Sequence, residues 1–363
     1  MYRILCRLSN RILQGSVNII NSLELLISLG TNINNIKVFD GRLPILHYAV
    51  IIDDRIIVAY LLNKGVDINA KDNNGNTSLH LTLKKEIDIS KLLISLGANV
   101  NARDNKGNTP LEIALDEDYI DIDVLELLIS SGADVNVKNN KGNNSLGNAL
   151  CKDYINIDII KLLISSGADV NVKNNKGNTP LHFGVKEDID IVKLLISSGA
   201  DVNAKNNKRN TPLERALDEI YSNIDIVKLL IFKGAYINNI KTFNGLSIFH
   251  LAVVMGELEL VKYLIDKGAG INDKMDNGIT LLHWGVIKNN ITMVGLLISL
   301  GANVNARDNS GSTPLDLAIV HNKYKMIRIL RSRGALGFMT WKKALGNSLR
   351  TDSEVNLISP SPQ

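Results

Sequence analysis

The stretch Gly107-Asn108-Thr109-Pro110-Leu111 opens a phrase that returns almost unchanged at Gly177 to His182 and again at Gly311 to Leu315. About twenty residues after each occurrence the chain reads Gly-Ala, in most copies followed by Asp or Asn, then Val and Asn. A fixed period near 33 residues indicates stacked structural repeats and not one globular core. The closing glycines are 32 to 35 residues apart and lie at Gly30, Gly65, Gly97, Gly132, Gly167, Gly199, Gly234, Gly268, Gly301 and Gly334.

The residues inside one repeat predict a pair of helices. The hydroxyl of Thr109 is suited to cap a first helix, and Pro110 fits the first helical turn, where its missing N–H is harmless. In the second helix Val124, Leu127 and Leu128 are spaced to form one apolar face, which neighbouring repeats must cover. Gly132 then follows the helix, where a residue with left-handed backbone closes the last turn.

This combination of period, Thr-Pro-Leu-His phrase, Leu-Leu-Ile run and Gly-Ala close resembles the ankyrin repeat, from about residue 39 to 334. The resemblance implies an all-α solenoid of helix-turn-helix units joined by short β-turn hairpins. It also implies that the histidine of the phrase is a scaffold residue, which hydrogen-bonds locally and to the next repeat. Glu112, Gly147, Glu214 and Asp316 replace that histidine in four repeats. The histidines at this position are His47, His80, His182, His250 and His283.

The repeats predict one elongated domain with two different ends. Residues 1–38 keep only the second half of a unit and are expected to form a degenerate N-terminal capping repeat. The ankyrin repeats are expected over residues 39–340, in nine units that start near 39, 72, 104, 139, 174, 206, 241, 275 and 308. Residues 341–350 are expected to form a capping helix or, alternatively, a docking segment, and 351–363 a disordered tail.

Composition excludes several classes of protein. With two cysteines, Cys6 and Cys151, a disulfide framework is not credible, and the net charge is only +4. We see no secretory signal and no apolar stretch long enough to span a membrane, so we expect a soluble intracellular protein. The richness in Asn, Ile and Lys resembles ankyrin proteins of large DNA viruses, intracellular bacteria and AT-rich protists. A viral or bacterial origin would place it in a host cell cytoplasm.

No spacing typical of catalysis is present. The sequence lacks the phosphate-binding G-x-x-x-x-G-K-[ST] and G-x-G-x-x-G motifs, the zinc motif H-E-x-x-H and the redox motif C-x-x-C. The acidic residues 116–118 lack the twelve-residue loop of a calcium site and are interpreted as a solvated face. We therefore expect a non-enzymatic protein with no catalytic residue, cofactor or metal.

A row of cations recurs on the turn tips of successive repeats, which we call the basic ladder. Such a row could attract an acidic protein or a nucleic-acid backbone, although no aromatic residues interleave with it. Solvation of duplicated turns is the alternative interpretation and leaves nucleic acid an unlikely partner. The basic ladder consists of Arg103, Lys106, Lys138, Lys141, Lys173, Lys176, Lys205 and Lys208.

The divergent repeats replace charge with apolar residues near the end of the first helix. In the family that the chain resembles, the concave face formed by first helices and turn tips holds partners. We therefore expect a protein partner on this face of a monomeric chain, since binding energy concentrates on apolar and aromatic patches. The alternative is that these side chains repack against irregular neighbouring residues or cover one another. The candidate residues are Phe243, Val254, Met255, Trp284 and Ile287, with a second set of Tyr48, Ile51 and Ile52.

Overall fold

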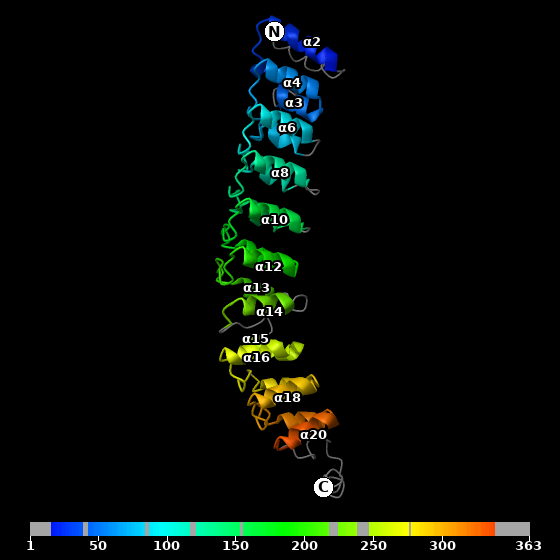
Figure 1. The fold of residues 1–363 in the computed structure, drawn as a ribbon, viewed down its shortest axis with the longest axis vertical. Helices are drawn as coiled ribbons and strands as arrows, with labels where there is room; N and C mark the ends of the chain where they lie inside the picture. The colour runs from blue at the N-terminus through cyan, green and yellow to red at the C-terminus, as the bar shows by residue number, and fades with distance from the viewer. Residues whose placement is uncertain are drawn as a thin grey trace. The chain divides into compact units, whose positions relative to one another are not determined.

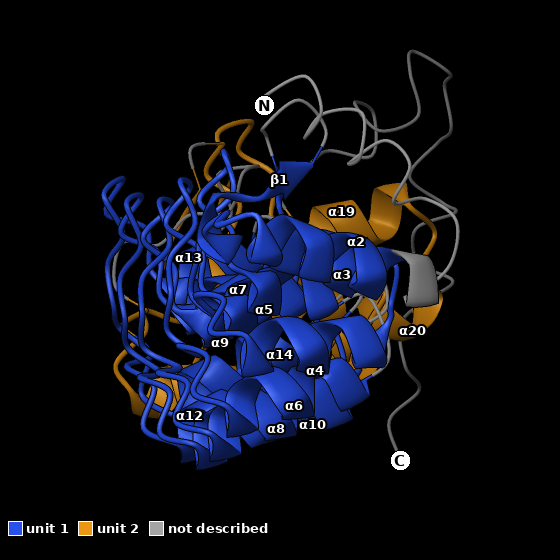
Figure 2. Ribbon diagram, turned by 90° about the horizontal axis from the view of Figure 1, so that it is seen from above, with its two compact units in different colours: residues 1–235 blue, residues 236–363 orange. Residues whose placement is uncertain are grey.

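The computed structural model describes residues 16–38, 43–83, 87–116, 121–152, 155–217, 224–237, 247–275 and 277–337. It divides into two compact units, unit 1 (residues 1–235) and unit 2 (residues 236–363), which Figure 2 colours blue and orange. The expected capping helix at 341–350 and the expected tail at 351–363 lie outside the described residues.

Unit 1 is a series of helix pairs that follow one another in chain order (Figure 1). Its first helices are α3 (Ile45–Ile51), α5 (Ser78–Thr82), α7 (Pro110–Ala114), α9 (Ser145–Ala149), α11 (Pro180–Gly184) and α13 (Pro212–Leu217). Its second helices are α2 (Ser16–Ser28), α4 (Arg55–Asn63), α6 (Ile87–Ser95), α8 (Ile122–Ser130), α10 (Ile157–Ser165), α12 (Ile189–Ser197) and α14 (Ile224–Phe232).

Short elements complete unit 1 at its first junction. A 3-10 helix, η1 (Ile33–Asn35), leads into the antiparallel pair of strands β1 (Lys37–Val38) and β2 (Leu43–Pro44). In their register Lys37 lies opposite Pro44, and Val38 lies opposite Leu43.

Unit 2 repeats the same arrangement three times. Its first helices are α15 (Ile248–Met255), α17 (Leu281–Ile287) and α19 (Pro314–Val320), and its second helices are α16 (Leu258–Asp266), α18 (Ile291–Ser299) and α20 (Tyr324–Ser332). A bridge between Lys274 and Thr280 marks one hairpin between repeats.

First helices pack on first helices and second helices on second helices. In unit 1, α3, α5, α7, α9, α11 and α13 contact one another in sequence, and α10, α12 and α14 do the same. Figure 2 shows the turns of unit 1 gathered on one side of these helices. Each repeat therefore covers the apolar face of its neighbour, as stacked repeats require.

Local chemistry sets the boundaries of α7 and α8 as the sequence predicts, but the buried face of α8 differs from the predicted one. Thr109 is the N-cap of α7 with Pro110 in its first turn, and Gly132 has φ +90° after α8. The buried face of α8, however, consists of Val124, Leu125 and Leu128. Leu127, which we expected on that face, is half-buried. The apolar run Leu-Leu-Ile allows either rotation, and packing against the next repeat decides between them.

Asparagine side chains fasten each repeat to the next. The amide of Asn101 donates to the carbonyl of Gly132 (2.9 Å), and its Oδ1 accepts from the N–H of Asp134 (2.8 Å). This pair of bonds satisfies backbone groups that the end of a helix leaves without partners. The same two bonds are made by Asn34, Asn136, Asn171, Asn272 and Asn305.

The turn tips interlock in a second way. Asn175 donates its side-chain amide to the carbonyl of Asn140 (2.8 Å) and its backbone N–H to that of Lys141 (3.1 Å). This approach requires glycine at position 142, because a Cβ there would lie 2.5 Å from Oδ1 of Asn175. Gly142 also has φ +78°, a backbone conformation that favours glycine. The tip glycine therefore serves both the turn and the junction between repeats.

Candidate partner-binding surfaces

The histidines of the repeated phrase are buried parts of the scaffold. Nδ1 of His182 accepts the N–H of Thr179 (3.1 Å), so Nε2 carries the proton and donates to the carbonyl of Asn210 in the next repeat (3.0 Å). His80 and His283 make the same two bonds. Burial lowers the pKa of each of these imidazoles, because a dry site disfavours the charged form.

The other two histidines keep only part of this arrangement. Nε2 of His47 lies 2.8 Å from the carbonyl oxygen of Asn76 in the next repeat. His250 has its local bond to the hydroxyl of Ser247 (2.6 Å), but its buried Nε2 has no hydrogen-bond partner among the described residues. Burial lowers the pKa of both rings. Nδ1 of His47 also lies 3.2 Å from the hydroxyl of Ser78, so a serine holds each of these two buried rings.

Carboxylates replace the histidine in three repeats and keep the local half of its role. The N–H of Thr109 donates to Oε2 of Glu112 (3.1 Å), and Glu214 and Asp316 accept equivalent bonds. Oε1 of Glu112 is buried with no hydrogen-bond partner in the described part of the chain, and desolvation raises the pKa of this carboxyl to about 7. At Gly147 the cap is instead Asn144, whose Oδ1 accepts the N–H of Gly147 (2.9 Å).

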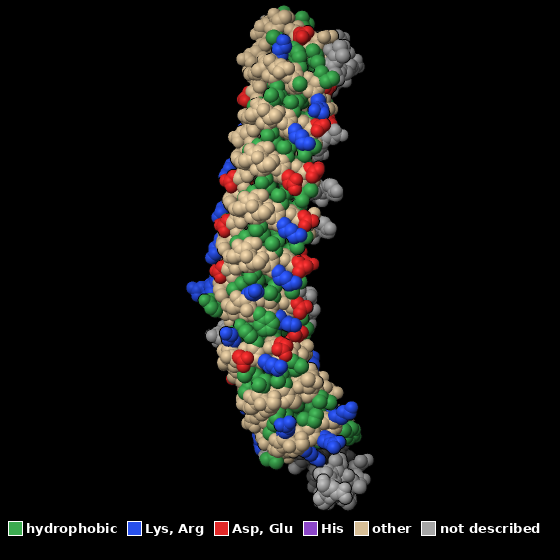
Figure 3. All heavy atoms as spheres, in the orientation of Figure 1, with side chains coloured by type: hydrophobic (Ala, Val, Ile, Leu, Met, Phe, Trp, Pro, Cys, Tyr) green, Lys and Arg blue, Asp and Glu red, His purple; other side chains and the backbone are tan. Residues whose placement is uncertain are grey.

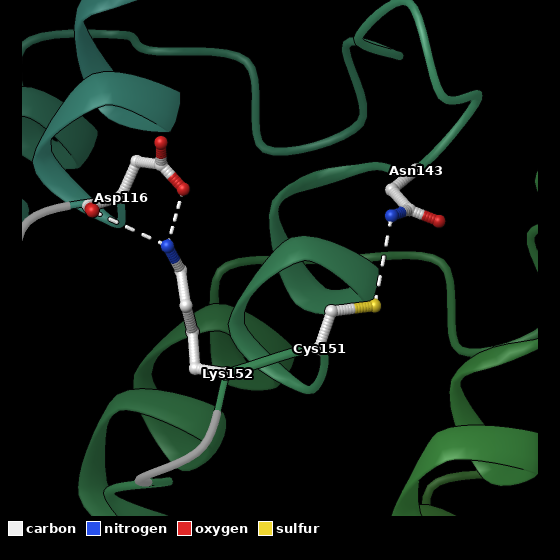
Figure 4. Close-up of polar contacts among 4 residues, drawn as sticks. All are labelled: Asp116, Asn143, Cys151 and Lys152. Carbon is white, nitrogen blue, oxygen red and sulfur yellow. Dashed lines mark hydrogen bonds and ion pairs between the residues drawn. The ribbon is translucent and has the colours of Figure 1, made fainter.

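The acidic residues near the end of α7 take part in an ion pair between repeats. Lys152, which follows α9, reaches both the carboxylate and the backbone carbonyl of Asp116 (Figure 4). Residues 117 and 118 of the acidic cluster lie outside the described residues. Nearby, Cys151 is free, and its sulfur accepts from the amide of Asn143 at 3.7 Å. Within the described ranges, no three His, Cys, Asp or Glu side chains are placed to hold a metal ion.

None of the helices in the described ranges is both long enough and apolar enough to cross a membrane.

The structure gives the basic ladder a role that the sequence did not indicate. All eight of its side chains are exposed. The ammonium of Lys138 donates to the carbonyl of Lys173 (3.1 Å), and that of Lys173 donates to the carbonyl of Lys205 (3.0 Å). Lys71 makes the same bond to Arg103 (2.8 Å). Lysines at this position therefore link successive turns. In the sequence, the only sign of this role is the equal spacing of the lysines.

The apolar candidates of unit 2 come from two neighbouring first helices. Val254 and Met255 end α15, Trp284 and Ile287 belong to α17, and these two helices contact each other. All four side chains are half-buried, so each keeps some accessible surface. Phe243 lies outside the described residues.

Contacts within its own repeat hold Trp284 in place. Its Nε1–H donates to the sulfur of Met275 (3.0 Å), and the ammonium of Lys288 lies 5.9 Å from its ring centroid. The indole is thus bonded at one edge to the turn that precedes α17. A rigid aromatic side chain of this kind loses little conformational entropy when a partner covers it.

The second set of apolar candidates, in unit 1, is only partly accessible. Ile51 and Ile52 have exposed fractions of 42% and 38%. Tyr48 is only 6% exposed, so it packs into unit 1 and offers little surface to a partner. Its position in the repeat is that of Trp284, and the alignment of repeats alone could not distinguish the two.

Two accessible apolar residues of the last repeat are not among the candidates that the sequence indicated. Val320 and Tyr324 are 42% and 73% exposed. Val320 follows its helix cap, Thr313, by the same seven residues as Ile287 follows Thr280. The sequence alone shows this seven-residue spacing, so Val320 could have been predicted as a candidate.

Comparisons with known proteins agree with this architecture. A model of the ankyrin repeat family, built from three repeat copies, matches residues 12–104, 46–139, 120–206, 146–241, 213–308 and 249–337. A stretch of 51 residues is 39% identical to a putative ankyrin repeat protein of fowlpox virus (strain NVSL). That stretch is 14% of this chain and 12% of the fowlpox protein, so the match covers a small part of either. The family model, in contrast, matches most of the chain, which therefore belongs to the ankyrin-repeat family.

Proposed function

We propose that this chain is a non-enzymatic recognition protein that binds a protein partner through the exposed ends of α15 and α17. Ankyrin repeats are protein–protein interaction modules. The surface that we propose consists of Val254, Met255, Trp284 and Ile287, and we call it the apolar surface of unit 2.

The observation that carries the proposal is a change in chemistry at one position of the repeat. Seven residues after the helix cap, two repeats of unit 1 carry the exposed charges Asp116 and Lys186, whereas two others have Ile51 and Cys151 there. Unit 2 has Val254 and Ile287 at this position. Where neighbouring repeats are solvated by charge, apolar replacements favour a surface that a partner covers.

Trp284 is the best candidate for an anchor within this surface. Trp is enriched among interface residues whose truncation is costly, because it buries a large area and carries one N–H donor. The sulfur of Met275 already satisfies that donor within the chain. A partner can then cover the indole without leaving its N–H unbonded.

The test has two steps: isolation of a partner by affinity capture, then affinity measurements with both proteins purified. The double variant Met255→Asp with Trp284→Ala should weaken binding at least about a hundredfold, since truncation of a single anchor costs about 2 kcal/mol or more. Leu96→Asp is the matched control, because Leu96 is a 52% exposed apolar residue of unit 1 outside the proposed surface. Unchanged affinity in a double variant of unaltered helical content would refute the proposal.

The basic ladder carries the alternative function, binding of nucleic acid or of another acidic partner. The bonds of Lys138 and Lys173 to the next repeat favour a structural use of these ammonium groups over a free phosphate-binding row. The variant Lys138→Ser with Lys173→Ser distinguishes a structural role of these lysines from a role in binding nucleic acid. Affinity for nucleic acid that depends steeply on salt and disappears in this variant would support the alternative.

A further inference from the structure

Four second helices, α10, α12 and α14 of unit 1 and α16 of unit 2, share a charge pattern on their outer surface. The second residue of the helix is an acid, and the fifth is a lysine that pairs with it. The ion pairs are Asp158 with Lys161 (2.9 Å), Asp190 with Lys193 (2.9 Å), Asp225 with Lys228 (3.3 Å) and Glu259 with Lys262 (3.0 Å). The repeats thus provide internal copies against which a departure can be judged.

The last two second helices depart from this pattern in different ways. In α18 the two positions hold Thr292 and Gly295, and the helix carries no charge. In α20 they hold Lys325 and Arg328, both exposed. Figure 3 shows the contrast: red and blue side chains lie together over α10 to α16, tan and green cover α18, and blue without red surrounds α20.

The cations of α20 do not stabilise the chain in the usual way. Lys325 lies in the first turn of α20, where the helix dipole disfavours positive charge. Neither Lys325 nor Arg328 forms an ion pair with a described residue. Arg331 and Arg333 lie at the other end of the helix, where the dipole favours positive charge, so they are not evidence for a binding surface. Residues 317–337 contain five Lys and Arg and no Asp or Glu, so the region has a net positive field.

Accessible apolar surface adjoins these charges. Tyr324 at the start of α20 is 73% exposed, and Ile291 at the start of α18 is 37% exposed. A Cβ on Gly295 would meet no atom within 4 Å, so the surface of α18 is open there. Since α18 and α20 pack side by side, an uncharged strip lies next to a basic one.

We propose that the outer face of α18 and α20 docks an acidic peptide segment of a protein partner. Its carboxylates pair with Lys325 and Arg328, and its apolar side chains lie over α18 around Gly295. Complementary charge would set the orientation of the peptide and speed its association. A long polyanion fits less well, because α18 beside these cations carries no charge to pair with it. This face is separate from the apolar surface of unit 2.

The test measures binding of a labelled peptide by fluorescence anisotropy, with the full-length chain. The probe is a peptide of about twelve residues in which Glu alternates with Leu. The variant Lys325→Glu with Arg328→Glu should weaken binding at least about tenfold, and added salt should weaken binding to the wild type. The control, Lys161→Glu with Lys193→Glu, makes the same change in net charge at the fifth residue of α10 and of α12, and should bind like the wild type.

A second variant distinguishes loss of the binding surface from loss of the fold. Gly295→Glu places a carboxylate in open space and replaces glycine by a better helix former, so the fold should persist while peptide affinity falls. Equal losses in the charge-reversal variant and its control would overturn the proposal. It would also be overturned if the Lys138→Ser, Lys173→Ser variant alone lost the peptide. Anionic vesicles or single-stranded RNA that bind this face in preference to the peptide would overturn its assignment to a peptide.

Discussion

Trp284 donates its indole N–H to the sulfur of Met275, with 3.0 Å between Nε1 and Sδ. Met275 lies in the turn before α17, so the bond joins the turn to the helix that carries the apolar surface of unit 2. A sulfur acceptor is weak, but the contact also packs a polarizable group against the edge of the ring. The anchor that we propose for a partner is therefore held before any partner arrives.

Met275→Leu removes this acceptor while keeping a side chain of similar volume. We expect the indole of Trp284 to become more mobile, the stability of the chain to change by less than about 1.5 kcal/mol, and partner affinity to fall. Quenching of tryptophan fluorescence by a neutral quencher would report the change, in a Trp341→Phe background that leaves Trp284 as the reporter. Identical quenching before and after the substitution would show that the sulfur contact does not hold the ring.

Two glycines with similar backbone but different surroundings provide a matched pair. Gly142 has φ +78° and a Cβ would lie 2.5 Å from Asn175, whereas Gly132 has φ +90° and a Cβ would meet nothing within 4 Å. Gly132→Ala should cost about 1–2 kcal/mol, the price of a left-handed residue with a Cβ. Gly142→Ala should cost roughly 1–3 kcal/mol more, because the next repeat must also move. Chemical denaturation of both variants measures the difference, and equal costs would mean that the tips do not interlock.

The sequence predicted the fold from features that act locally. The cap at Thr109 and the left-handed Gly132 depend on residues within a few positions, and both lie where expected. The choice between Leu125 and Leu127 for the buried face depends on the next repeat, which periodicity does not describe. The accessibility of the candidate site residues likewise depends on neighbouring repeats and could not be predicted from periodicity. Tyr48 and Trp284 share a register, yet their exposure differs with their neighbours.

Contacts that cross between repeats were the hardest to foresee. The sequence shows equally spaced lysines, but it does not show that the carbonyl of Lys173 lies within reach of Lys138. The asparagine bonds, such as that of Asn101 to Gly132, have the same cause. Both depend on the path of the backbone one repeat away, which follows from stacking and not from local preference.

The buried histidines should make the chain less stable in mild acid. Burial lowers the pKa of all five imidazoles of the repeated phrase below the ordinary value of 6.5. The unfolded chain therefore binds protons first as the pH falls, so the stability that these rings contribute is complete above pH 6.5 and is lost below it. Denaturation midpoints between neutral and mildly acidic pH should fall. His182→Gln keeps a capping acceptor without the titration and should reduce that slope; an unchanged slope would contradict the assignment.

Glu112 should produce the opposite dependence on pH. Its side chain is 2% exposed, and desolvation raises the pKa of the carboxyl from an ordinary value of 4.5 to about 7. The folded chain holds this proton more tightly than the unfolded chain. The stability that it contributes is therefore complete below pH 4.5 and is lost as the pH rises to about 7. This difference corresponds to about 3 kcal/mol.

Glu112→Gln isolates this effect, because glutamine retains an oxygen that accepts the N–H of Thr109 but does not titrate. Relative to the wild type, the variant should gain stability as the pH rises from 4.5 to about 7 and keep a constant advantage above that range. Glu214→Gln, at the same capping position but half-buried, controls for the loss of one negative charge. Denaturation curves across this range give the comparison. Parallel profiles for the Glu112 variant and the wild type would show that the buried carboxyl does not hold its proton in the folded chain.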